Sequence, residues 1–222
     1  MSEKIRIDLP PSEHVTAILY PAAPSKRVVV RLILAHGAGS NQLSGTMTRT
    51  ASVLADRGFE TVTFNFLYSE KRRRAPDKND KLEACWRRVL ERFRETGRKL
   101  VIGGKSMGGR IASQVAAADS SGIAGLVFLG YPLHPPGRPE QLRSKHLPDI
   151  RVPMLFVQGS KDAFGTPEEL KPILKTLEHA ELCVVEDADH SFKVPKRAAL
   201  SQEKVDAFVL DQLEAWLHRR IA

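Results

Sequence analysis

The feature that most constrains the fold of this chain is a regular alternation of short apolar runs with amphipathic segments. Such alternation is typical of a mostly parallel sheet with helices on both faces. The first two runs flank Pro10-Pro11 and predict an antiparallel pair. Together the runs predict about eight strands, at Lys4–Asp8, Val15–Tyr20, Val28–Ala35, Thr61–Phe64, Leu100–Gly103, Gly125–Leu129, Met154–Gln158 and Leu182–Val185.

Four of the intervening segments have helical signals. Apolar residues fall on one stripe from Leu82 to Phe93 and again from Val205 to Leu217. The small residues of Met107–Ala118 suit a helix that lies close to a sheet. Thr166-Pro167-Glu168-Glu169 is a capping box that begins a fourth helix. Tyr131–Pro153 has no clear periodicity and is too short for a cap domain, so we expect at most a small lid.

Length and composition indicate one globular domain over residues 1–222, with 42% apolar and 27% charged residues. No apolar run is long enough to span a membrane. The N-terminus lacks the apolar core of a signal peptide, and Cys85 and Cys183 have no short-range partner, so we expect a cytoplasmic protein with buried thiols. The net charge is +8, but only Tyr68 accompanies the basic run 71–74, which disfavours a nucleic-acid partner.

The strongest chemical signal is Gly104-Lys105-Ser106-Met107-Gly108, which joins a predicted strand to a predicted helix. This pattern is typical of a nucleophile elbow, where glycines free a sharp turn of side chains and the serine hydroxyl projects above the sheet. The letters Gly-Lys-Ser also end a phosphate-binding loop. That motif requires glycine five positions before Gly104, and Lys99 stands there, so the spacing excludes it.

A second glycine-rich loop, His36-Gly37-Ala38-Gly39-Ser40, follows the strand Val28–Ala35. Hydrolases of this architecture take a backbone donor for the oxyanion from such a loop. We therefore predict an oxyanion hole formed by the amides of Ala38 and Met107, with Gly39 as the alternative to Ala38. His36 is expected to make structural hydrogen bonds.

The order serine, acid, histidine along the chain predicts the partners of Ser106. Asp162 and His190 each follow a predicted strand, which places them where sites form in open α/β sheets. We predict that His190 is the general base and that Asp162 orients it. Asp187 and Asp189 are competing acids, but they share the loop of His190 and more readily shape that turn.

Three residues are candidates for substrate binding. Lys105 flanks the nucleophile, Gly39 lies in the glycine-rich loop, and His134 lies in the Pro-rich stretch 131–153. Lys105 and Arg110 together predict a preference for anionic acyl groups. Neither the cysteine spacing nor any histidine motif indicates a metal site, and no cofactor is predicted. The predicted ligand is thus a small acyl substrate, and the sequence leaves the oligomeric state open.

These motifs resemble the small bacterial α/β-hydrolases that are similar to dienelactone hydrolases and are related to a hydrolase-like subunit of a eukaryotic histone acetyltransferase complex. The resemblance spans about Lys26 to Leu217. It implies an α/β-hydrolase fold without a large cap domain, and a serine esterase instead of a cysteine lactonase. The matching blocks are Ala35–Gly39, Gly103–Arg110, Gly130–Gly137, Gln158–Asp162 and Asp189–Phe192.

The sequence supports two alternative hypotheses about function. The leading hypothesis is a serine hydrolase that cleaves carboxylic esters or thioesters through an acyl-enzyme. The alternative is a binding or scaffold module that keeps the fold and holds a partner through its basic surface or its Pro-rich segment.

Overall fold

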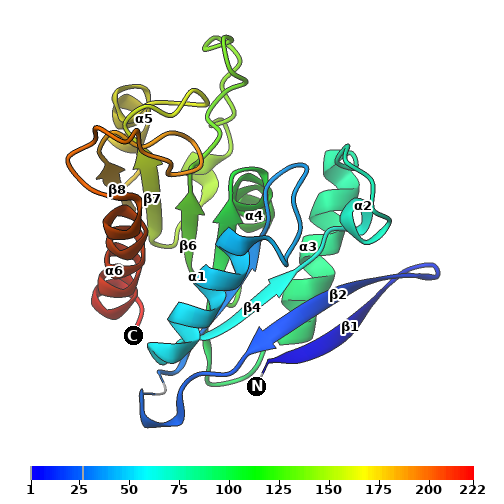
Figure 1. The fold of residues 1–222 in the computed structure, drawn as a ribbon. Coiled ribbons are helices and arrows are strands. Elements are labelled where there is room, and N and C mark those ends of the chain that lie inside the picture. The colour runs from blue at the N-terminus through cyan, green and yellow to red at the C-terminus, as the bar shows by residue number, and fades with distance from the viewer. Residues whose placement is uncertain (1, 27) are drawn as a thin grey trace.

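The computed structural model describes residues 2–26 and 28–222. One eight-stranded sheet runs through it in the order β1-β2-β4-β3-β5-β6-β7-β8 (Figure 1). The strands β1 and β2 form an antiparallel hairpin, β2 pairs antiparallel with β4, and all other pairs are parallel. The prediction of a mostly parallel sheet is confirmed. The strands are β1 (Glu3–Leu9), β2 (Glu13–Tyr20), β3 (Val30–Ala35), β4 (Glu60–Phe64), β5 (Lys99–Lys105), β6 (Ile123–Leu129), β7 (Met154–Gly159) and β8 (Ala180–Val185).

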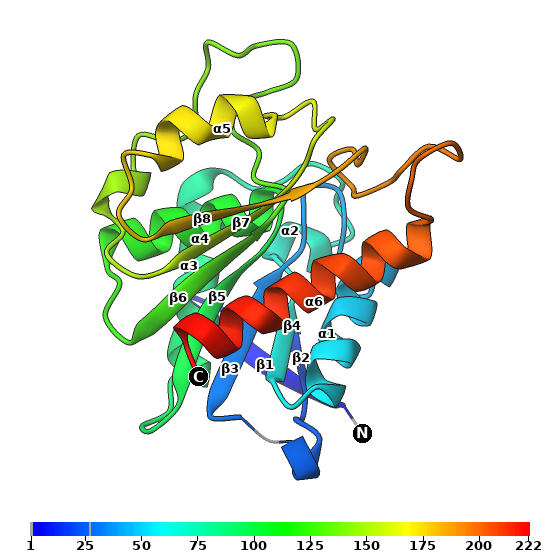
Figure 2. The same cartoon turned by 90° about the vertical axis from the view of Figure 1, so that its left-hand side faces the viewer.

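Helices cover both faces of this sheet, so that β3, β4 and β7 are buried at every position. In β3, Ile33 and Ala35 face one apolar core and Leu32 and Leu34 face the other. The first core packs under α3, α4 and α5, and the second packs under α1 and α6, which lie side by side in Figure 2. The helices are α1 (Gly45–Asp56), α2 (Leu67–Glu70), α3 (Asn79–Phe93), α4 (Met107–Ala118), α5 (Pro167–Leu174) and α6 (Gln202–Arg220), with short 3₁₀ turns at Pro24–Lys26 and Leu147–Asp149.

The four predicted helices are present. At the start of α5, the Thr166 side chain accepts from the Glu169 amide and the Glu169 carboxylate accepts from the Thr166 amide, so the predicted capping box is confirmed. Helix α1 was not predicted. Three of its five buried residues, Thr50, Ala51 and Ala55, are small or polar, so its apolar stripe is weak.

The stretch between β6 and β7 packs partly into the core. Leu133 and Leu147 are fully buried, and the Tyr131 hydroxyl donates to the Arg143 carbonyl at 2.7 Å. The tip of the loop projects beyond the sheet at the top of Figure 1. Both cysteines are free thiols, Cys85 buried and Cys183 partly buried. Among the described residues, no helix combines the length and apolar character that a membrane crossing requires.

Candidate active site

Ser106 lies on a sharp turn between the end of β5 and the start of α4. Its backbone adopts φ 51° and ψ −120°, a conformation that residues with a side chain rarely occupy. A Cβ atom at Gly104 would lie 2.1 Å from the Ala35 carbonyl oxygen, and one at Gly108 would lie 2.4 Å from the same oxygen. The turn therefore requires glycine on each side of the serine, as a nucleophile elbow does.

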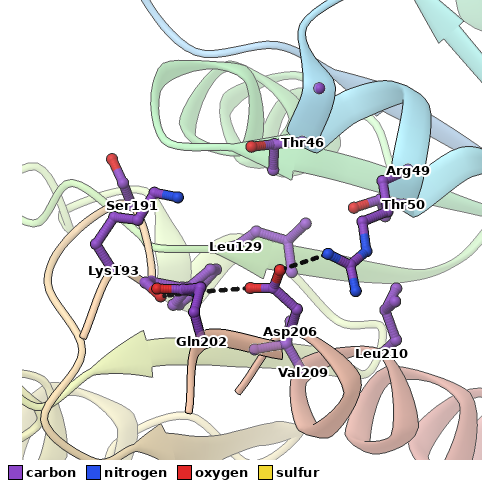
Figure 3. A pocket seen from close by; sticks show the side chains of 12 residues that line it. Thr46, Arg49, Thr50, Leu129, Ser191, Lys193, Gln202, Asp206, Val209 and Leu210 are labelled. Atoms are coloured by element: carbon purple, nitrogen blue, oxygen red, sulfur yellow. Dashed lines mark hydrogen bonds and ion pairs between the residues drawn. The ribbon is translucent and has the colours of Figure 1, made fainter. Parts of the chain in front are cut away.

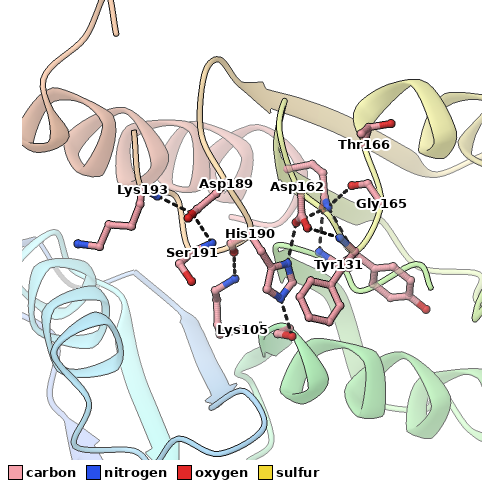
Figure 4. A network of polar contacts seen from close by, with 12 residues as sticks. Lys105, Tyr131, Asp162, Gly165, Thr166, Asp189, His190, Ser191 and Lys193 are labelled. Carbon is pink, nitrogen blue, oxygen red and sulfur yellow. Dashed lines mark hydrogen bonds and ion pairs between the residues drawn. The ribbon is translucent and has the colours of Figure 1, made fainter. Parts of the chain in front are cut away.

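His190 connects Ser106 with Asp162. Its Nε2 lies 2.8 Å from Ser106 Oγ, and its Nδ1 lies 2.7 Å from Asp162 Oδ2. Figure 4 shows the imidazole ring directed at the Asp162 carboxylate. A neutral imidazole carries one N–H and one lone pair. With the hydrogen on Nδ1 toward the carboxylate, Nε2 can accept a proton from the serine hydroxyl.

The Asp162 carboxylate is fully buried but has several hydrogen-bond partners. Besides His190, it accepts from the Gln158 side-chain amide at 2.7 Å and from the Phe164 backbone amide at 2.8 Å. The same Gln158 amide group donates to the Gly165 carbonyl at 2.7 Å. A buried carboxylate with these partners keeps a fixed orientation, because leaving any of them unpaired would cost free energy.

The competing acids shape the His190 loop. Asp189 accepts hydrogen bonds from the backbone amides of Ser191 and Lys193, at 2.7 and 2.8 Å. Asp187 pairs with Lys161 at 2.5 Å near the surface. Of the three candidate acids, Asp162 alone contacts the His190 ring.

Two backbone amides beside Ser106 have no internal acceptor. Within residues 2–26 and 28–222, neither the Ala38 N–H nor the Met107 N–H donates a hydrogen bond. Met107 is the first residue of α4, where the free N–H groups and the helix dipole favour negative charge. Ala38 lines the cavity in front of Ser106, whereas Gly39 does not. Both amides are thus free of partners within the protein, although Met107 itself is not among the residues that line the cavity.

This cavity, which we call the serine cavity, has a volume of about 310 Å³. The Phe164 ring lies over the His190 imidazole, with centroids 4.2 Å apart. The cavity is lined by Gly37, Ala38, Ser40, Ser44, Thr46, Met47, Lys105, Ser106, Phe164, His190 and Ser191.

Residues 28–218 match the model of a protein family described as the α/β-hydrolase domain. The chain belongs to the α/β-hydrolase family. It is similar in structure to an α/β serine hydrolase without a lid from Xanthomonas campestris, with a TM-score of 0.77, 22% identity, and 98% and 94% of the two chains covered. It is also similar to a serine hydrolase homologue from Coxiella burnetii (TM-score 0.74, 21% identity, 99% and 97% covered).

A dienelactone hydrolase from Anabaena variabilis is similar as well, with a TM-score of 0.74, 19% identity, and 100% and 99% of the two chains covered. Identities this low establish a common fold and no common substrate. The resemblance to dienelactone-hydrolase-like α/β-hydrolases is confirmed at this level. The relationship to a histone acetyltransferase subunit stays a prediction.

Lys105 of this α/β-hydrolase lines the serine cavity. Its ammonium group is directed at the loop 186–201 that carries His190, which we call the histidine loop (Figure 4). It donates to the His190 carbonyl oxygen and lies 5.1 Å from the centre of the Phe192 ring. Burial lowers the pKa of the Lys105 ammonium to about 8. Arg110, the other cation predicted to favour anionic acyl groups, instead contacts Gln114 and Asn79.

His36 makes hydrogen bonds that hold the glycine-rich loop 36–40 in place. Its Nδ1 donates to the Gly37 carbonyl at 2.8 Å and its Nε2 accepts from the Phe66 amide at 3.2 Å, an arrangement that requires the neutral ring. Burial lowers the pKa of His36 to about 4. The expected structural role agrees with these contacts.

His134 does not line the serine cavity, which corrects its selection as a substrate-binding candidate. The side chain is 4% exposed, with Nδ1 bonded to the Pro135 carbonyl at 2.8 Å and Nε2 lying 3.2 Å from Glu169. The contact with Glu169 connects the Pro-rich segment, residues 131–153, with the start of α5. No residue of 131–153 lines the cavity.

Sequence reasoning missed the cavity residues that α1 and its approach contribute, Ser44, Thr46 and Met47, and also Phe164. Met47, Ala51 and Leu54 do recur at helical spacing, and this signal could have located α1. Phe164 follows Asp162 by two residues, and its role depends on a loop conformation that no periodic pattern encodes.

Proposed function

We propose that this α/β-hydrolase cleaves a carboxylic ester or thioester through an acyl-enzyme formed on Ser106. The observation that carries the proposal is the pair of contacts made by His190, 2.8 Å to Ser106 Oγ and 2.7 Å to Asp162 Oδ2. A nucleophile bonded to a base that is held by a buried acid is the arrangement acyl transfer needs. Family membership and the two free amides support the same reaction class.

In the first half-reaction, Ser106 Oγ attacks the carbonyl carbon while its proton moves to His190 Nε2. The carbonyl oxygen becomes an oxyanion within reach of the Ala38 and Met107 amides, and losing one such donor typically reduces turnover by ~10²–10³. The bond to the leaving alcohol or thiol then breaks, and the leaving atom takes the proton from Nε2. Asp162 stabilises the imidazolium that exists between these steps.

In the second half-reaction, water replaces the alcohol. A water molecule gives a proton to His190 Nε2 as its oxygen attacks the acyl carbon, and the same amides hold the second oxyanion. When the bond to Ser106 Oγ breaks, the serine regains the proton from Nε2 and the carboxylic acid leaves. Thr46 and Ser191 line the serine cavity and are exposed to solvent, so water can reach the acyl-enzyme from this side.

A fluorophosphonate probe tests this proposal, because it labels only a serine that a neighbouring base activates. We expect labelling of the wild type, none of Ser106→Ala, and loss of p-nitrophenyl acetate hydrolysis in the same variant.

The chain offers a matched control on α4, the helix that follows Ser106. Ser113 Oγ lies 2.7 Å from His146 Nε2, but Ser113 is fully buried and lines no part of the serine cavity. Ser113→Ala should therefore keep the label. A wild type that takes up no probe and turns over no ester would contradict the proposal and favour the binding-module alternative.

A further inference from the structure

A second cavity, which we call the interhelix cavity, lies between the N-terminal halves of α1 and α6 (Figure 3). Its volume is about 440 Å³, larger than that of the serine cavity. Apolar side chains form part of its lining, from β6 (Leu129), the histidine loop (Phe192) and α6 (Val209 and Leu210). Nothing in the acyl-transfer steps above uses this space.

The interhelix cavity adjoins the serine cavity. Thr46 and Ser191 line both cavities. Their side chains are small and exposed to solvent, so little bulk separates the two cavities. Leu129 also connects the backbone of the nucleophile with the interhelix cavity. Its carbonyl oxygen accepts the Ser106 amide hydrogen at 3.1 Å, while its residue lines the interhelix cavity. A molecule bonded to Ser106 Oγ therefore has room to continue past α1.

Three polar side chains at the rim, those of Arg49, Asp206 and Gln202, are engaged with one another, while Lys193, which also lines the cavity, is exposed to solvent. Arg49 Nη1 bonds Asp206 at 2.6 Å across the two helices, and Gln202 donates to Asp206 at 2.7 Å and to the Phe192 carbonyl at 2.8 Å (Figure 3). An ion pair satisfied in this way has little charge left for a ligand. The lining consequently favours a neutral, largely apolar group, which gains by leaving water.

We propose that the interhelix cavity binds the apolar arm of the ester, so that the substrate is a neutral ester with a medium-length aliphatic or single-ring group on one side of the reacting carbonyl. This proposal rests on the hydrolase function proposed above. A cavity of this size falls within the range that holds small ligands, about 300–1,000 Å³. Short acyl probes would occupy the serine cavity alone and lose this contact.

The test compares two series of neutral esters, p-nitrophenyl acetate to hexanoate for the acyl arm and ethyl to hexyl acetate for the alcohol arm. In the wild type, we expect kcat/KM to rise with length in one series, by up to roughly fourfold per methylene. The measured quantity is the ratio of kcat/KM for the long ester to that for the short one, which does not depend on the fraction of folded enzyme.

Two variants fill the interhelix cavity from opposite sides, Val209→Phe on α6 and Thr50→Leu on α1, and neither residue lines the serine cavity. Each should reduce the long-to-short ratio by at least roughly tenfold, because the added bulk displaces the arm. The matched control is Val53→Phe, on α1 but outside both linings, which should keep the wild-type ratio.

Three results would overturn the proposal. A flat length profile in both series, with acetate turnover that Ser106→Ala abolishes, would refute the interhelix cavity and leave the hydrolase function standing. A length preference that survives both Val209→Phe and Thr50→Leu would do the same. Acetate turnover that persists in Ser106→Ala would instead refute the proposed hydrolase function, and the binding proposal with it.

Discussion

Replacing Gly104 by alanine tests whether the elbow is as tightly built as its geometry indicates. Gly104 is at φ +143° and pairs in register with Ala35 of the neighbouring strand β3. An added Cβ would lie 2.1 Å from the Ala35 oxygen and 2.7 Å from its nitrogen. Those atoms are backbone in the middle of the sheet, so they cannot move aside as a flexible side chain could.

The expected loss of unfolding free energy in Gly104→Ala has two parts. Holding alanine in this backbone region costs about 1–3 kcal/mol. Forcing an extra carbon between two paired strands costs about 1–3 kcal/mol more. The unfolding free energy should thus fall by roughly 2–6 kcal/mol, and Tm by about 2–4 °C for each kcal/mol in a chain of this length.

The assay is urea unfolding followed by circular dichroism, with Gly97→Ala as the control. Gly97 also has a positive φ, +85°, but no atom lies within 4 Å of its Cβ position, so alanine there meets only the backbone penalty. Gly104→Ala should be the more destabilising by about 1–3 kcal/mol. Equal losses in the two variants would refute the steric argument for the elbow.

Three further outcomes are expected. Asp162→Asn should reduce kcat for p-nitrophenyl acetate by on the order of 10⁴, because His190 loses its carboxylate; a loss below about tenfold would contradict the orienting role. The folded-state pKa of His36 is about 4, below the usual histidine value of 6.5, so stability should fall by up to roughly 3 kcal/mol as pH drops from 6.5 to about 4. Urea titrations should show a weaker pH dependence in His36→Gln. The lowered pKa of Lys105 means that the unfolded chain binds more protons from about pH 8 to about pH 10.5. Tm of the wild type should rise relative to Lys105→Met across that range, and a constant difference would count against a buried ammonium.

The sheet could be predicted because its evidence is local. Strands such as β6 and β7 are apolar runs, and the glycines that flank Ser106 indicate a turn that excludes side chains. The positions of Asp162 and His190 then followed from chain order, since the carboxyl ends of β7 and β8 lie at the same edge of the sheet as that of β5.

What the sequence did not predict depends on how elements pack. His134 stands beside proline and glycine in a segment that suggested a binding loop, yet its ring is buried against Glu169, 35 positions away. Lys105 flanks the nucleophile in sequence, but a backbone carbonyl 85 positions away fixes its ammonium group. Neither contact has a periodic or motif signal, because each requires a loop to be placed against a helix or strand that is distant in the sequence.

The interhelix cavity also could not be predicted from the sequence, because it depends on how two helices pack. Its width depends on the separation of α1 and α6, which contact each other through ion pairs 154 to 157 positions apart along the chain. Arg57 reaches both Asp211 and Glu214 at 2.7 Å, and Arg49 reaches Asp206 at the end nearer to Ser106. The cavity lies at that end, where Leu129 and Phe192 form part of its lining between the two helices. The proposed reaction class thus rests on loops that the motifs reveal, whereas the proposed selection among esters rests on a space between two helices that only their packing creates.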